Sequence, residues 1–356
     1  MTLPALSFPI LYDVSWTLHR LQWPSQSNAP FALLSLSNPR NRNNRAKQMQ
    51  EFLHIDEAGP EADNAFDEKV GAIKKVKWEV LEDVRDLDVE EDLDDGGRTG
   101  GYVHMNGSRG GRAAGNGNEV GSGIVVTLTY EAAEYRVILY GPAPGSASAS
   151  DHALPLLLTK TPPLLSKRIF TFLLDTFDIR MSPFKVPDIL LRQALESYIQ
   201  ILYKAISTFS GLRKTAFLSA TLQDVKITLS FRPPVAPHLR SIDFDIQTDT
   251  VCNMIDTAVT NKVDFTQVLD SHINHYTAMQ MDLPSAQGNE GSNTPEPEPL
   301  MWISKIVCNA FAISGDGRFK LVDKACRAAD IDNLGTVVRE ANNMLLGRLL
   351  AQAVQP

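Results

Sequence analysis

Alternation of apolar and polar residues predicts half-buried strands along the chain. The pattern begins at Tyr12, Val14, Trp16 and Leu18, whose neighbours are polar, and a period of two is typical of a strand with one buried face. The stretches with this period are residues 12–18, 76–80, 225–231 and 242–246. The run FALLSL at 31–36 is the expected partner of the first strand. Residues 123–130 and 134–140, separated by three residues, predict a β-hairpin.

Apolar residues three or four positions apart predict helices between these strands. The predicted helices cover residues 38–54, 164–177, 188–206, 264–280 and 333–354. In the helix at 188–206 the apolar stripe consists of Leu191, Ala194, Leu195, Tyr198, Leu202 and Ala205. In the helix at 264–280 the expected inner side consists of Phe265, Val268, Leu269, His272, Tyr276 and Met279.

A last hairpin is expected near the C-terminus, where two apolar stretches flank the turn SGDG at 314–317. We interpret its two strands as Trp302–Ile313 and Arg318–Val322. Strands joined by short turns pair antiparallel, and the helices arrive in blocks between strand pairs. The order therefore favours an α+β fold over a doubly wound parallel sheet.

Glycine and acidic residues mark a long insertion between the predicted strands. Residues 79–95 hold ten acidic residues and one Arg, and residues 96–123 hold eleven of the 22 glycines. We expect a disordered acidic and Gly-rich insertion there, with further loops at 141–151 and 284–299. The expected organisation is an N-terminal lobe beginning with 1–82, the insertion 83–122, a hairpin and helical middle at 123–210, a C-terminal α+β lobe at 211–325 and a helix at 326–356.

Composition indicates a soluble intracellular protein with a large core. The chain has 356 residues, of which 43% are hydrophobic, enough for two lobes or one large one. Three cysteines, Cys252, Cys308 and Cys326, cannot build a disulfide framework. No apolar run approaches the roughly 20 residues of a membrane helix, and the start lacks a basic segment.

Charge is distributed unevenly. The net charge is −8, but residues 160–240 hold twelve basic and five acidic residues, a net of +7, and residues 241–300 hold ten acidic residues and one Lys, a net of −9. The basic middle can give one face of the fold a positive field. The plainer interpretation is that its lysines and arginines are solvated separately on different faces.

No motif supports catalysis, a cofactor or a metal. The segment GNGNEVG at 115–121 lacks the strand, the helix and the Lys of a phosphate loop. His272 and His275 have no HExxH context or further ligands, and a packed histidine is the simpler interpretation. Asp243 and Asp245 alternate with apolar residues, which indicates the wet face of a strand. We therefore predict no catalytic residues, cofactors or metal sites.

Four stretches together resemble the fungal members of the CENP-L family, which are subunits of the constitutive inner kinetochore. They are YDVSWTLHRL (12–21), LPLLLTKTPPLLSKRIFTFLLDTFDIRMSPFK (154–185), VKITLSFRPPVAPHLRSIDFDI (225–246) and SKIVCNAFAISGDGRFKL (304–321). The resemblance spans roughly 11–322, and the helix at 333–354 looks like an addition. It implies a non-enzymatic, nuclear scaffold at the centromere, built from two α+β lobes with curved, mainly antiparallel sheets.

The resemblance also implies partners: a CENP-N-like subunit bound through the C-terminal sheet region, other inner-kinetochore subunits, and centromeric nucleosomes and DNA without sequence preference. No membrane or small-molecule substrate is implied. A hairpin at a sheet edge can add strands from a partner. The expected contacts on the last hairpin are Ile303, Ile306, Phe311, Ile313, Phe319 and Leu321. The alternative is that these residues fill the core of their own lobe.

The basic middle then becomes an expected site of phosphate contacts. These are Lys160, Lys167, Arg168, Arg180, Lys185, Arg213, Lys214, Lys226 and Arg232. Thr161-Pro162 and Ser182-Pro183 also fit proline-directed phosphorylation. Two alternatives remain open: an enzyme with an unrecognised site in the cleft between sheet and helices, and a nuclear adaptor that binds acidic peptides.

Overall fold

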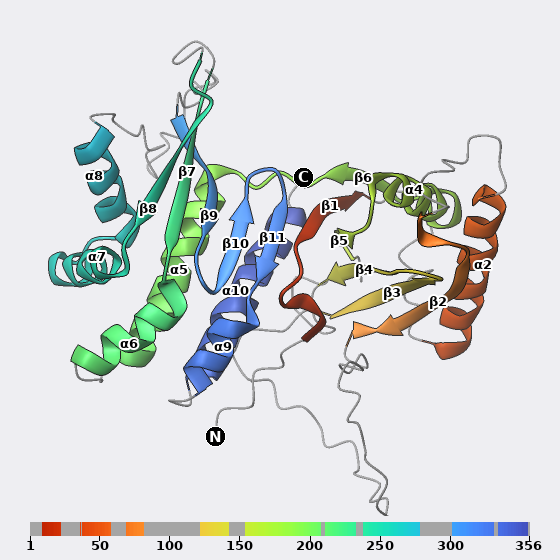
Figure 1. The fold of residues 1–356 in the computed structure, drawn as a ribbon, viewed down its shortest axis with the longest axis horizontal. Coiled ribbons are helices and arrows are strands. Elements are labelled where there is room, and N and C mark those ends of the chain that lie inside the picture. Colours follow the sequence, from red (N-terminus) through yellow and green to blue (C-terminus); the bar gives the residue numbers. More distant parts are fainter. Residues whose placement is uncertain are drawn as a thin grey trace, which may run out of the picture.

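The structure is a computed structural model of the chain (Figure 1). It describes residues 9–22, 36, 38–57, 69–81, 122–141, 154–207, 211–232, 238–277, 301–330 and 334–354. Most of the acidic and Gly-rich insertion, the loop at 284–299 and most of FALLSL lie outside the described residues. No helix in the described part is both long and apolar enough to cross a membrane.

One sheet of eleven strands organises the molecule, in the order β2-β3-β4-β5-β1-β11-β10-β9-β7-β8, with β6 paired to β1. The strands are β1 (Trp16–Gln22), β2 (Ile73–Val80), β3 (Ser122–Tyr130), β4 (Glu134–Gly141), β5 (Leu156–Lys160), β6 (Arg180–Pro183), β7 (Val225–Phe231), β8 (Ser241–Ile246), β9 (Met301–Val307), β10 (Phe311–Ser314) and β11 (Arg318–Leu321). Neighbouring strands pair antiparallel, which confirms the predicted α+β class.

Strand β1 joins the two halves of this sheet. Thr17 lies opposite Thr159 of β5 on one side and opposite Arg318 of β11 on the other. The first strand of the chain is therefore central, and its neighbours come from the middle and the end of the sequence. The predicted alternation from Tyr12 begins before the strand itself, since Asp13 has a φ of 58° and interrupts the extended backbone.

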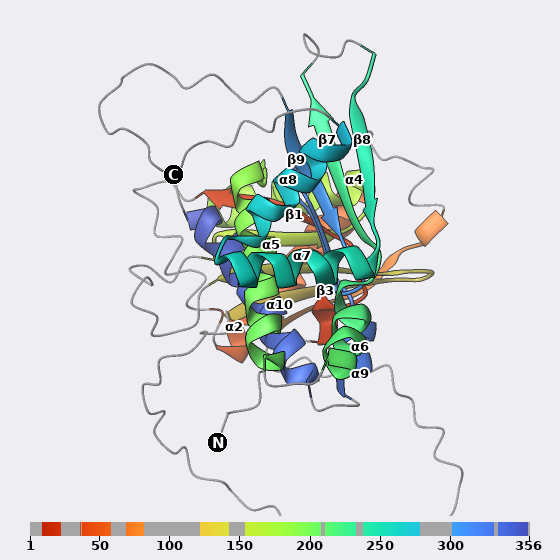
Figure 2. The same ribbon diagram turned by 90° about the vertical axis from the view of Figure 1, so that its left-hand side faces the viewer.

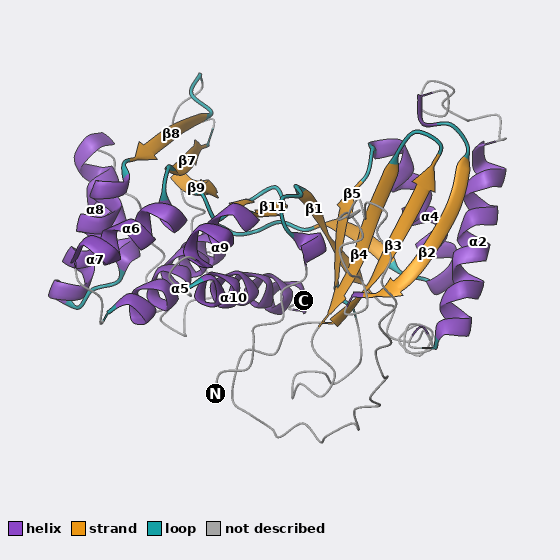
Figure 3. Ribbon diagram, turned by 60° about the horizontal axis from the view of Figure 1, so that its bottom comes forward, coloured by secondary structure: helices purple, strands orange, loops and turns teal. Residues whose placement is uncertain are grey.

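Helices cover opposite faces of the two halves (Figures 1 and 3). They are α2 (Pro39–Glu57), α4 (Pro163–Phe177), α5 (Asp188–Ile206), α6 (Gly211–Leu222), α7 (Thr248–Asn261), α8 (Phe265–Thr277), α9 (Asp323–Asp330) and α10 (Gly335–Val354), with a 3₁₀ turn η1 (Pro9–Leu11) at the start. Helices α2 and α4 lie beside β2–β4, whereas α5, α9 and α10 lie against β9–β11. Figure 2, viewed from the β8 end, shows α7 crossing in front of α5 and α10.

The alternation in β1 shows which face each helical layer occupies. Trp16 and Leu18 belong to the apolar cluster that contains α5 and α10. Leu21 belongs to the cluster of α4, and the ring of His19 contacts Phe170 of that helix at 4.8 Å. Because successive side chains of a strand point to opposite faces, α4 lies on the face opposite α5 and α10.

The predicted last hairpin needs correction, since its first strand is two strands. Residues 308–310 reverse the chain, so β9, β10 and β11 form a three-stranded meander. The meander also lies within the sheet, because β9 pairs with β7 and β11 pairs with β1. The expectation that this hairpin forms a sheet edge is therefore wrong.

The predicted inner side of α8 is partly wrong. Its buried residues are Phe265, Leu269, Asp270 and Ile273, whereas Tyr276 is 69% exposed and His272 is half-buried. The buried stripe is rotated toward Asp270 because this carboxylate has an arginine partner inside the protein, which apolar periodicity cannot reveal.

Helix α10 is part of the core. Its residues Val338, Ala341, Leu345 and Leu349 are buried in the cluster shared with α5. The buried Asn342 accepts a hydrogen bond from the Tyr198 hydroxyl at 3.2 Å, and its amide donates to the Tyr12 hydroxyl at 3.3 Å. This network ties the last helix to α5 and to the start of the chain.

Candidate functional site

The C-terminal half of the sheet has one face without a helical layer among the described residues. Along β7, the buried Val225, Ile227, Leu229 and Phe231 alternate with half-buried polar residues. The buried set faces α5 and α10, so the polar set faces the other side. We call this surface of β7, β9, β10 and β11 the open face.

A polar row crosses the sheet on this side. Cross-strand neighbours point to the same face, and the register places Thr228 opposite Lys305, Lys305 opposite Ser314, and Arg318 opposite Thr17. Ser314 and Arg318 flank the three-residue β10–β11 turn, and Thr17 in turn lies opposite Thr159. The row, Thr228–Lys305–Ser314–Arg318–Thr17–Thr159, thus crosses β7, β9, β10, β11, β1 and β5 at one level and ends beside α4.

A hollow of about 1010 Å³ begins at the open face and is also lined by Asp188 of α5 and Gln352 of α10. Its basic lining residues are Lys185, Arg232, Lys305 and Arg318, and Asp188 and Asp316 are the acidic ones. Asp316 pairs with Arg318 at 3.3 Å. The hollow is wide and its charged lining residues are mostly basic, which suits an extended anion better than an enclosed small molecule.

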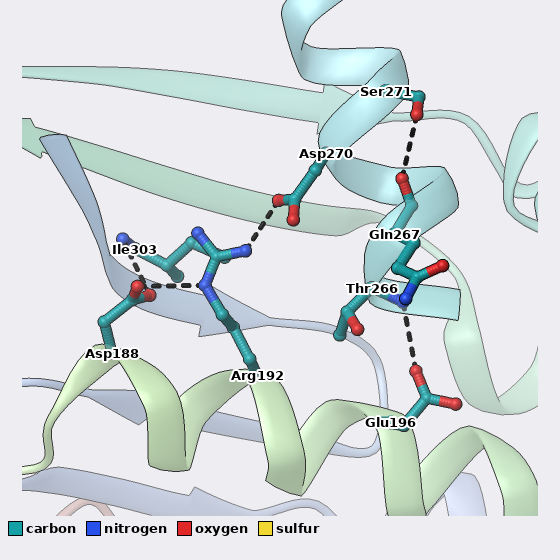
Figure 4. A network of polar contacts seen from close by, with 8 residues as sticks. All are labelled: Asp188, Arg192, Glu196, Thr266, Gln267, Asp270, Ser271 and Ile303. Atoms are coloured by element: carbon teal, nitrogen blue, oxygen red, sulfur yellow. Dashed lines mark hydrogen bonds and ion pairs between the residues drawn. The ribbon is translucent and has the colours of Figure 1, made fainter. Parts of the chain in front are cut away.

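One wall of this hollow is held by a buried ion-pair network (Figure 4). Arg192 of α5 donates from Nε to Asp188 at 2.9 Å and from Nη1 to Asp270 of α8 at 2.6 Å. The second oxygen of Asp188 accepts the backbone N–H of Ile303 in β9 at 3.0 Å. Asp188 is fixed at the hollow because α5, α8 and β9 share this network.

Electrostatics in the network depend on burial. Burial raises the pKa of the Asp270 carboxyl and the Asp188 carboxylate raises it further, while Arg192 lowers it. The other oxygen of Asp270, Oδ2, is buried and accepts no hydrogen bond from the described residues. One turn further along α5, Glu196 accepts the Thr266 N–H at 3.0 Å, near the start of α8. The network is structural, since its charges are paired within the chain.

Three of the predicted basic residues lie on the open face or its hollow. Lys226 points outward from β7, where a 3.1 Å ion pair with Asp245 raises its pKa, and Lys185 and Arg232 line the hollow. Sequence reasoning missed Lys305, Arg318 and Lys320, which lie outside the basic segment of the sequence. Arg318 and Lys320 alternate with the apolar Phe319 and Leu321, which was the available signal, whereas Lys305 reaches the open face through a register shift after Ile303 that alternation does not predict.

The other predicted basic residues are dispersed. Lys160 ends β5, Arg180 begins β6, and Lys167 is exposed on α4, where Arg168 is only 5% exposed. Arg213 and Lys214 lie on α6, on the helical side, and Lys214 pairs with Asp256. The nine residues therefore do not share one face, and Arg168 is in the core rather than on the surface.

The six residues predicted to contact a partner all lie in the core of the chain. Ile303, Ile306, Phe311, Ile313, Phe319 and Leu321 are each at most 1% exposed. Phe311 contacts the ring of Tyr198 in α5, with centroids 4.7 Å apart. A charged residue at Phe311 would unfold this core, so it would not isolate an interface. The strands at the two ends of the described sheet are β2 and β8, and β6, off this path, pairs with β1 alone.

The described residues form no arrangement typical of a metal or cofactor site. No group of three or more His, Cys, Asp or Glu side chains is arranged to hold a metal ion in the described part of the chain. Asp243 and Asp245 are exposed on β8, as their alternation predicts. Cys308 and Cys326 are buried, and burial raises the pKa of the Cys308 thiol to about 11. Such a thiol is a poor nucleophile.

Comparison with known families gives one match. A family model described as centromere protein L matches residues 10–354. The matched segment includes α10, so the expectation that the last helix is an addition to the family pattern is wrong. The search of curated proteins found no match.

Proposed function

Because the chain belongs to the CENP-L family, whose members are kinetochore subunits, we propose that it is a non-enzymatic scaffold that pairs with a CENP-N-like subunit and supports binding of centromeric DNA. The observation that carries the DNA proposal is the basic open face. The protein would act in the nucleus, at the centromere, together with other inner-kinetochore subunits.

The row on the open face has the dimensions of a backbone contact. Its six strands lie about 4.8 Å apart, so the row is roughly 24 Å long. Lys305 and Arg318 are exposed within it, with Ser314 between them and Thr17 beside Arg318. Cationic and hydroxyl groups without base-reading helices favour phosphate contacts, which bind DNA regardless of sequence.

The test is salt-dependent DNA binding by the complex co-expressed with a CENP-N-like subunit. We expect Lys305→Glu/Arg318→Glu to weaken binding and to reduce the slope of log affinity against log salt by about two. Arg213→Glu on α6 is the matched control, since it is exposed on the helical side. An equal loss in the control, or no loss in the double variant, would refute the open face as the DNA surface.

We place the pairing surface at β8, the free end of the sheet in its C-terminal half. Among the described strands β8 pairs with β7 alone, and its outward Asp243 and Asp245 are exposed. An edge strand can accept a strand from a partner. The residues predicted to contact the partner on the β9–β11 meander would then affect pairing only indirectly, because they form the core that holds β7 and β8 in place.

Proline scanning tests this edge. Successive backbone N–H groups of a strand point to opposite sides, so Asp243→Pro and Phe244→Pro each remove one N–H, only one of which faces β7. We expect the variant that loses the outward N–H to keep the native melting temperature. Light scattering should show that this variant no longer forms a complex with the CENP-N-like subunit. Retention of the partner by both variants would contradict pairing through β8.

Binding of acidic peptides is a second candidate function. The half-buried Trp302 lies in the hollow with the basic residues, and an aromatic side chain can anchor a peptide. An acidic peptide that displaces DNA from the complex would show a shared surface, whereas peptide binding without DNA binding would favour the adaptor.

A further inference from the structure

The two Ser/Thr-Pro dipeptides lie in different structural contexts. In sequence, Ser182 is the stronger kinase site, because Lys185 supplies the basic residue three positions later that many proline-directed kinases prefer. Thr161 has Leu164 at that position. The structure reverses this order.

Ser182 is half-buried on β6, which among the described strands pairs with β1 alone. It lies in β6 opposite Arg20 of β1, and the following backbone donates from Phe184 to Leu18 at 3.1 Å and from Val186 to Gly315 at 3.0 Å. In an extended strand Ser182 and Phe184 point to the same side, and Phe184 is only 3% exposed. A kinase could reach Ser182 only after β6 separates from β1 and Phe184 leaves the core.

Thr161 lies outside the sheet, between the end of β5 and the start of α4. Its side chain lines a second hollow, of about 460 Å³, and is half-buried, while Pro163 is exposed. Its hydroxyl is 2.7 Å from the hydroxyl of Ser166, a contact that a single rotamer change releases. The acceptor oxygen is therefore accessible without opening the sheet.

The surroundings of Thr161 suit a phosphate. Lys160 and Arg136, which lie opposite each other on β5 and β4, line the same hollow. Arg136 is already paired with Glu134 at 2.8 Å, and the two side chains are 35% and 43% exposed. A phosphate opposite such cations gains charge-assisted hydrogen bonds, with Ser166 as a further donor.

We propose that Thr161 is the site of phosphorylation by a proline-directed kinase, and that the phosphate reduces the affinity of the complex for DNA. Thr161 Oγ1 attacks the γ-phosphorus of ATP and forms an O–P bond. The bond from that phosphorus to the β,γ-bridging oxygen breaks, and ADP leaves with the electron pair. The hydroxyl proton passes to the catalytic base of the kinase.

The effect on DNA rests on the proposed function, because the second hollow adjoins the end of the polar row at β1 and β5, next to the open face. Thr17 and Thr159 belong to the row and also line this hollow. A phosphothreonine carries about −1.5 to −2 charges at neutral pH, so it would offset the two cations beside it and repel the DNA backbone.

The first experiment maps the site. The co-expressed complex is incubated with ATP and a purified cyclin-dependent kinase, and modified residues are identified by tandem mass spectrometry. We expect phosphate on Thr161, its loss in Thr161→Ala, its return in Thr161→Ser, and unchanged incorporation in Ser182→Ala. Phosphate on Ser182 with none on Thr161, or no phosphate on either residue, would overturn the assignment.

The second experiment measures DNA affinity before and after modification. We expect the phosphorylated complex to bind more weakly, and Thr161→Ala to be insensitive to the kinase. Failure of the unmodified complex to bind DNA would refute the proposed function and leave the mapped site intact. Equal binding before and after modification of Thr161 would overturn the regulatory effect alone.

Discussion

Replacing Arg192 with Leu would remove the cation from the network that joins α5, α8 and β9. The side chains of Arg192, Asp188 and Asp270 are 8%, 17% and 6% exposed, so water cannot take the place of the guanidinium. The variant leaves two carboxylates close together without their common partner, and leucine fills much of the same volume.

The expected loss of folding free energy is large for a single substitution. Removing one partner of a buried ion pair costs about 3–5 kcal/mol, because the remaining charge is buried without compensation. In a protein of this size 1 kcal/mol corresponds to about 2 °C in melting temperature, so we expect Arg192→Leu to lower it by roughly 6–10 °C.

Thermal unfolding of Arg192→Leu and two control variants measures this loss of stability. Arg136→Leu breaks the Arg136–Glu134 pair, whose side chains are 35% and 43% exposed, and should cost less than about 1 kcal/mol. Arg192→Leu/Asp270→Leu also removes the more deeply buried of the two carboxylates that Arg192→Leu leaves without a partner, and should recover part of the lost stability.

The cost should also depend on pH. Burial raises the pKa of Asp270 above the ordinary value of 3.8, so the native state binds this proton more tightly than the unfolded chain. Its contribution to stability is present below the ordinary value and is lost as the pH rises through the native pKa. Without Arg192, which lowers this pKa, the loss extends to higher pH. Arg192→Leu should therefore be less destabilising near pH 5 than near pH 7.5.

Two outcomes would refute the reasoning. One is a melting temperature for Arg192→Leu equal to that of the exposed control at every pH. The other is that Asp270→Leu, added to Arg192→Leu, lowers the melting temperature further instead of raising it. That result would mean that the unpaired carboxylate does not cause the loss of stability.

Two further predictions concern single positions. Asn342→Leu leaves the buried Tyr198 hydroxyl without its acceptor, and we expect a loss of about 1–3 kcal/mol in chemical unfolding; an unchanged midpoint would show that the Tyr12–Asn342–Tyr198 network adds nothing. Gly317 has a φ of 81° in the β10–β11 turn, and an added Cβ would meet the carbonyl oxygen of Phe184, so Gly317→Ala should lower the melting temperature clearly, whereas Gly347→Ala, where a Cβ meets nothing within 4 Å, should not.

Local pattern predicted most of the elements. The period of two in β7 and the three- to four-residue spacing in α5 survive in the structure because each element buries one face. The division of the last hairpin into β9 and β10 was missed because apolar residues continue through the reversal at Cys308 and Ala310, both of which are buried.

The candidate site was harder to predict, because it depends on register. The charge of residues 160–240 pointed to a basic region, yet Arg213 and Arg168 in that segment lie on other surfaces or in the core. Lys305 and Arg318 join the open face only because β9 and β11 align with β7 and β1. Pairing between strands nearly 300 residues apart cannot be deduced from periodicity.

The central position of β1 has a consequence for synthesis in the cell. Trp16 must wait for Phe319, its partner across β11, to leave the ribosome. At about 5–20 residues per second, roughly 300 residues take some 15–60 seconds. During that time the start of β1, at Trp16 and Thr17, has no β11 to pair with, whereas its end can already pair with β6. Stalled or prematurely terminated chains would contain β1 but lack β11, through which β1 is joined to the C-terminal half of the sheet.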